Sequence, residues 1–189
     1  MRAISCTAFL GVVILWLLPG LVAGAGSVEA PSKAIEAAFL RNFFHYVTWP
    51  DSVLPDSISA WQIGILGSDP FGEVLEYTLD GRTEQGRPFR VHRAETLVAL
   101  PRCHIIFIAI PDADERRLVL GRLEGQPVLT VGDSPGFLEE GGIVHFDVGE
   151  YVKLGINLDR ARASALVIQT KMLEVAHEII DGGTRRKRR

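Results

Sequence analysis

The sequence predicts one α/β domain, a mostly parallel sheet with flanking helices in flavodoxin-like order, extended by a C-terminal antiparallel hairpin and helix. Short apolar segments alternate with helical ones, which is typical of parallel strands joined by crossover helices. Residues 105–110 are apolar at every position, as in a central strand buried on both faces. Residues 143–148 and 151–156 alternate around Gly149-Glu150, which predicts a two-residue hairpin turn.

The first 25 residues have the pattern of a cleavable signal peptide. Arg2 supplies positive charge, residues 8–18 are apolar, and Ala23-Gly24-Ala25 fits the small-residue rule of signal peptidase. The apolar run is shorter than the roughly 20 residues that span a bilayer. We therefore expect cleavage after residue 25 and a periplasmic protein; an uncleaved N-terminal anchor is the alternative.

The mature domain is expected over residues 26–181, with helices and strands alternating in its first part. Ser32 is the expected N-cap of the first helix, which ends before Trp49-Pro50 because a residue preceding proline avoids the helical region. Asp69 is the expected N-cap of the second helix, with Pro70 at its first position. The expected strands are residues 63–66, 88–92, 105–110 and 128–131, and the further helices are residues 95–100 and 112–123.

After Asn157 the spacing of apolar residues predicts helix as far as Ile179, with a possible break near Ser164. Residues 182–189 begin with two glycines and end in five basic residues. We expect a flexible basic tail, which is either a solubilising segment or weakly attracted to an anionic membrane surface.

Six residues are assigned to structure. Asn42 lies along the apolar face of the first helix, where a polar side chain needs a hydrogen-bond partner. Asn157 ends a strand and is expected to cap the following helix. Cys103 is the only cysteine left after cleavage, so we expect a buried, inert thiol, with intermolecular pairing as the alternative. The other three are Phe39, Phe43 and Trp49 of the first helix region.

No motif in the sequence indicates a catalytic site or a binding site for a metal, a cofactor or nucleic acid. A net charge of −3 argues against general nucleic-acid binding. The five histidines lack metal-ligand spacing, and no serine lies in a nucleophile elbow. Cys103 and His104 are adjacent on a predicted strand, so their side chains point to opposite faces. The loop 67–72 lacks the lysine of a phosphate-binding loop.

Two loops are the expected binding surface. Asp69 and Phe71 follow the first strand, and Asp133 and Phe137 follow the fourth, in a glycine-rich segment. In a flavodoxin-like sheet both loops emerge at the same edge, where ligands commonly bind. Phe137 is either a lid residue packed on the core or an exposed contact.

Several segments together resemble the YfiR family. They are residues 37–43 with Trp49-Pro50, 66–72, 103–108, 128–137 and 156–158, in the family's order within residues 34–176. The resemblance implies a periplasmic, non-enzymatic protein that represses an inner-membrane diguanylate cyclase through the cyclase's periplasmic sensor domain, and so controls cyclic di-GMP and biofilm. It also implies an outer-membrane lipoprotein that relieves repression.

This chain departs from the family in its cysteines. The family's namesake has paired cysteines, whereas only Cys103 is present in the mature chain, so redox control through disulfides is not implied here. The identity of the partner does not transfer with the resemblance, and a homodimer is left open. A periplasmic small-ligand-binding sensor is the alternative function.

Overall fold

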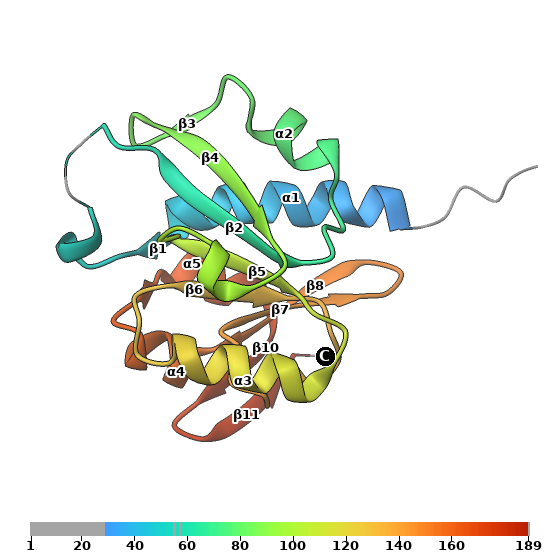
Figure 1. Cartoon of the computed structure of the whole chain (residues 1–189). Coiled ribbons are helices and arrows are strands. Elements are labelled where there is room, and N and C mark those ends of the chain that lie inside the picture. The colour runs from blue at the N-terminus through green and yellow to red at the C-terminus, as the bar shows by residue number, and fades with distance from the viewer. Residues whose placement is uncertain (1–28, 55, 57, 189) are drawn as a thin grey trace, which may run out of the picture.

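The computed structural model describes residues 29–188 apart from 55 and 57, so the predicted signal peptide lies outside the described residues (Figure 1). The described part contains a nine-stranded mixed sheet and a two-stranded sheet, β1 (Val47–Thr48) with β9 (Val167–Ile168). In spatial order the large sheet comprises β11 (Thr184–Lys187), β10 (Ala176–Asp181), β8 (Val152–Asn157), β7 (Val144–Val148), β6 (Leu129–Gly132), β5 (Ile105–Ala109), β2 (Trp61–Gly67), β4 (Arg87–Ala94) and β3 (Thr83–Glu84).

Helices cover both faces of this sheet. They are α1 (Glu29–Tyr46), α2 (Glu73–Leu79), α3 (Ala113–Leu123), α4 (Leu158–Ala163) and α5 (Thr170–Val175), with short 3-10 turns η1 (Asp51–Val53) and η2 (Leu97–Ala99). Residues of α1, α4 and α5 share one apolar core with one face of the strands, and residues of α3 share a second core with the other face. The result is the three-layer arrangement visible in Figure 1.

The parallel part of the sheet confirms the predicted strand order. The strands β4, β2, β5, β6 and β7 are neighbours in that order and all pair in parallel, which is the flavodoxin-like arrangement. The antiparallel β7–β8 hairpin follows, as predicted. Because Val148 pairs with Val152, the turn contains the three residues 149–151, one more than expected.

The first helix begins at Glu29, so Ser32 is not its N-cap but a buried residue inside it. Pro31 does not prevent the earlier start, since the first N–H groups of a helix have no intrahelical acceptor. Described helices include none with the length and apolarity that a membrane span requires.

The C-terminal region differs most from expectation. The predicted break at Ser164 is present, because Ser164 caps the C-terminus of α4. The predicted helix to Ile179 is wrong beyond α5: residues 176–181 form β10, in which Ile179 and Ile180 pair with β8. Strand pairing suits these β-branched residues better than a helix does.

The segment expected to be a flexible tail instead forms β11, paired with β10. Gly182 and Gly183 both have positive φ, 57° and 69°, as a two-residue hairpin turn requires. Both of their N–H groups donate to the Asp159 carboxylate, at 2.9 and 2.8 Å. Two glycines that suggested flexibility are therefore turn residues.

Candidate functional site at the carboxyl edge of the sheet

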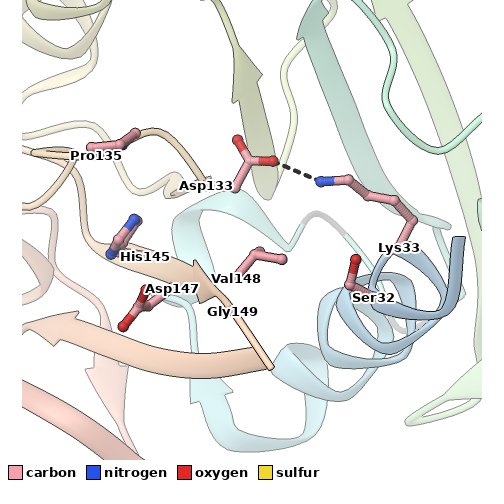
Figure 2. Close-up of a pocket in the computed structure, with 8 residues that line it drawn as sticks. All are labelled: Ser32, Lys33, Asp133, Pro135, His145, Asp147, Val148 and Gly149. Carbon is pink, nitrogen blue, oxygen red and sulfur yellow. Dashed lines mark hydrogen bonds and ion pairs between the residues drawn. The ribbon is translucent and has the colours of Figure 1, made fainter. Parts of the chain in front are cut away.

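The two predicted loops emerge at the same edge of the sheet, as expected. The strands β2, β5 and β6 run parallel, so the loops after β2 and β6 both leave from their carboxyl ends. β5 lies between β2 and β6. The N-terminal half of α1 supplies the charged side chain that links this edge to the helix layer (Figure 2).

The first loop is a turn held by Asp69, whose side chain is engaged within the protein. Its Oδ1 accepts a hydrogen bond from the Phe71 N–H at 2.9 Å, and its Oδ2 accepts one from Arg93 Nε at 2.6 Å. Asp69 is not the predicted helix cap, because α2 begins at Glu73 after Gly72. Phe71 is buried and stacks edge-on against Phe107, with ring centroids 4.8 Å apart, so its side chain is not available as a surface contact.

Phe137 in the second loop is the lid residue packed on the core, not the exposed contact. Its side chain is 0% exposed. The ring lies so close to Gly132 and Gly142 that a Cβ at either position would stand 2.6 or 2.1 Å from ring atoms. Gly132 and Gly142 therefore make room for the ring, whereas Gly136 and Gly141 have positive φ of 82° and 108°. These structural roles explain the composition that suggested a binding loop.

A buried ion pair fixes the same loop to α3. Arg116 and Glu140 have side chains only 5% and 6% exposed and form two parallel hydrogen bonds of 2.8 Å. The other guanidinium nitrogen of Arg116 donates to the carbonyls of Ile110 and Pro111 at 2.8 and 2.7 Å. Such a bidentate pair holds its partners in a fixed geometry, so the loop is a rigid part of the edge.

Asp133 joins this edge to α1 through a charged network. Lys33 Nζ donates to Asp133 Oδ2 at 2.6 Å and to Glu36 Oε2 at 3.0 Å. Burial lowers the pKa of Lys33, but the hydrogen bonds to Asp133 and Glu36 outweigh it, and the net direction is upward. Glu36 is completely buried, and this burial raises the pKa of its carboxyl to about 7 even though Lys33 lowers it.

A cavity of about 510 Å³ opens beside this network (Figure 2). Its walls come from α1, the loop after β6, and the β7 strand with its turn. Figure 2 shows the Lys33–Asp133 hydrogen bond at one side and His145 and Asp147 at the other. The lining residues are Ser32, Lys33, Asp133, Pro135, His145, Asp147, Val148 and Gly149.

Most of the residues assigned to structure lie in the core. Phe43 and Trp49 are buried, and the Trp49 indole N–H donates to the His104 carbonyl at 3.1 Å. Phe39 is half-buried and packs against the rings of Phe43 and Phe146. The expectation for Asn42 is wrong: its side chain is exposed and accepts a hydrogen bond from the neighbouring Arg41, because α1 turns this position away from the sheet.

Cys103 and Asn157 lie as predicted. Cys103 is a free, buried cysteine, and burial raises the pKa of its thiol to about 11, so little of it is thiolate at neutral pH. Asn157 caps α4: its Oδ1 accepts from the Arg160 N–H at 3.1 Å. Its amide also donates to the Leu138 carbonyl at 3.3 Å, which ties the Phe137 loop to the hairpin.

Sequence reasoning missed Lys33 and Glu36. Both lie on the same stripe of α1 as the buried Leu40 and Phe43, at three- and four-residue spacing. The sequence feature that could have indicated them is the presence of charged residues on the apolar stripe of a helix. No three His, Cys, Asp or Glu side chains in the described part of the chain are placed to hold a metal ion.

The comparison with protein families finds a match that covers this edge of the sheet. Residues 33–177 match the model of a family described as YfiR/HmsC-like, so the match begins at Lys33 and includes both loops, the hairpin and the cavity-lining residues other than Ser32.

Proposed function

Because the chain belongs to the YfiR/HmsC-like family, we propose that it is a non-catalytic periplasmic regulator that represses a membrane-bound diguanylate cyclase. It does so by binding the cyclase's periplasmic sensor domain. The extent of the family match, residues 33–177, carries this proposal.

The chemistry of the edge supports a binding role. Asp69 is engaged with Arg93, Asp133 with Lys33, and Glu140 with Arg116, so these charged groups fix the shape of the edge. The Cys103 thiol is buried, with its pKa raised to about 11, which makes it a poor nucleophile at neutral pH.

We place the partner surface at the exposed part of this edge, next to the cavity. Tyr151 lies in the β7–β8 turn close to the lining residue Gly149, and 69% of it is exposed. Exposed aromatic side chains are over-represented among the residues that contribute most to protein–protein binding. Asp69 and Asp133 hold the edge from within, while Phe71 and Phe137 support it from the core.

Crosslinking in cells followed by purification from membranes tests the function and the surface separately. The wild-type protein is expected to recover a membrane protein with a cyclase domain, and Tyr151→Ala to recover much less of it. Tyr77→Ala is the matched control, because Tyr77 is 76% exposed on α2. Recovery of no membrane signalling protein by the wild type contradicts the function, and equal recovery by Tyr151→Ala contradicts only the surface.

The cavity favours a second candidate function, that of a periplasmic sensor for a small ligand. Its volume of about 510 Å³ lies in the range of small-molecule sites, and it combines charged and apolar lining residues. The two functions are compatible, since a ligand bound at the edge would alter the surface presented to the cyclase.

A further inference from the structure

The ammonium group of Lys33 is surrounded by the chemistry of an amine-binding site. Two carboxylates contact it, Asp133 at 2.6 Å and Glu36 at 3.0 Å. Two aromatic rings flank it, with the centroids of Phe71 and Phe107 at 5.7 and 5.9 Å. Carboxylates and aromatic faces together are what proteins use to bind organic ammonium groups. We call these four residues the amine cage.

Lys33 does not satisfy every hydrogen-bond acceptor of the amine cage. Glu36 is 0% exposed, and its Oε1 has no hydrogen-bond partner, although it lies 3.0 Å from the Lys33 nitrogen. A buried acceptor without a donor is destabilising. An ammonium group placed to donate hydrogen bonds to both Glu36 oxygens would therefore stabilise the cage.

The cavity meets the amine cage at Asp133, whereas Glu36, Phe71 and Phe107 lie behind Lys33 and are not among the lining residues. Lys33 and Asp133 both line the cavity, and the Lys33 side chain is 11% exposed. A lysine stem has four rotatable carbons, so the Lys33 ammonium can leave the cage without any change in α1. Exchange for a second amine replaces one ammonium by another and leaves the buried carboxylates paired.

The remaining lining indicates the rest of the ligand. Pro135 and Val148 supply apolar surface. The backbone of Asp147 pairs with Lys153 of β8, but its side chain has no hydrogen bond or ion pair among the described residues. The lining therefore holds a second carboxylate for a cation and has no spare lysine or arginine for an anion. We propose that this cavity binds a small molecule that carries a primary ammonium group on a short apolar body, and that Lys33 occupies the ammonium position in the ligand-free protein. This inference rests on the sensor function proposed above and deepens it.

Titration of the purified full-length mature protein with n-butylammonium chloride tests the proposal. Saturable binding in the millimolar range, followed by NMR of the Phe71 and Phe107 rings, is expected, whereas sodium butyrate and potassium chloride at equal ionic strength produce no saturable change. Asp133→Asn is expected to weaken binding about tenfold through loss of a charge-assisted hydrogen bond. Asp114→Asn is the matched control, because Asp114 is exposed on α3, with 86% of its side chain accessible.

A second variant tests whether the cage recognises ammonium groups. Lys33→Ala leaves the cage empty, and methylammonium chloride is expected to raise its Tm, whereas potassium chloride is not. Lys153→Ala, at an exposed position on β8, is the control and should not respond. If Lys33→Ala does not fold, the wild-type titration alone decides.

Three results would overturn the proposal. They are no saturable binding of n-butylammonium to the wild type, equal binding of butyrate, and unchanged affinity in Asp133→Asn. The first of these results would overturn the proposal even if methylammonium stabilised Lys33→Ala, because a ligand would then be unable to displace the Lys33 ammonium from the cage. None of these measurements involves the cyclase, so their failure is distinct from failure of the regulatory function.

Discussion

Replacing Phe137 by alanine is expected to destabilise the domain strongly. The ring is 0% exposed and belongs to the apolar core under α3. Truncating a buried phenylalanine costs roughly 3–5 kcal/mol, which combines lost transfer free energy with the cavity left behind. At about 2–4 °C per kcal/mol for a domain of this size, the Tm should fall by roughly 6–20 °C.

A double-mutant cycle with Gly132 tests the reason for this cost. A Cβ at Gly132 would stand 2.6, 2.7 and 2.9 Å from three atoms of the Phe137 ring. Gly132→Ala alone should therefore cost about 1–3 kcal/mol by overpacking. In the double variant the new methyl group enters space that the ring has left, so the double variant should be no less stable than Phe137→Ala.

Urea unfolding followed by tryptophan fluorescence measures the four free energies of the cycle. The expected coupling is about 1–3 kcal/mol in favour of the double variant. Strict additivity, or a Gly132→Ala protein as stable as the wild type, would show that the ring does not pack against Gly132 and would refute this explanation of the glycine-rich loop.

Three further predictions concern the buried carboxyl, the thiol and export. The pKa of Glu36 is raised from 4.5 to about 7, so its protonated form stabilises the fold below pH 4.5, and this stability is lost as the pH rises to 7. At about 1.4 kcal/mol per pH unit, the loss of stability is at most about 3 kcal/mol. Urea unfolding between pH 4.5 and 7.5 should show this loss in the wild type but not in Glu36→Gln. The same pH dependence of stability in both proteins would contradict the raised pKa of Glu36. Cys103 should react slowly with thiol reagents in the native protein and rapidly in urea, and rapid native labelling or a disulfide-linked dimer on non-reducing gels would contradict its burial. Mass spectrometry of periplasmic protein should find an N-terminus near Gly26, and an intact Met1 on a membrane-embedded form would contradict cleavage.

The parallel part of the fold could be predicted because its signals are local. The run that becomes β5 is apolar throughout, and Asn157 stands where a strand ends and a helix needs a cap. The C-terminal strands could not be predicted in this way. Ile179 fits both a helical spacing and a strand, and only pairing with β8, distant in the sequence, decides between them.

The candidate site was predictable in position but not in detail. Asp133 lies at the predicted edge, but its partner Lys33 is 100 residues away in the sequence, and only the fold brings the two together. Phe137 remained ambiguous because the sequence does not show that Gly132 and Gly142 enclose its ring. Asn42 was misplaced because its helical spacing from Phe39 and Tyr46 fits the edge of the apolar stripe as well as its centre.

The most direct test of the regulatory function is the cellular concentration of cyclic di-GMP. Deleting the gene should raise it, and expressing the full-length chain should restore the original level. A version that lacks residues 1–25 should not restore it, because the proposed partner domain is periplasmic. Unchanged cyclic di-GMP on deletion, or full restoration by the version without residues 1–25, would contradict repression of a cyclase from the periplasm.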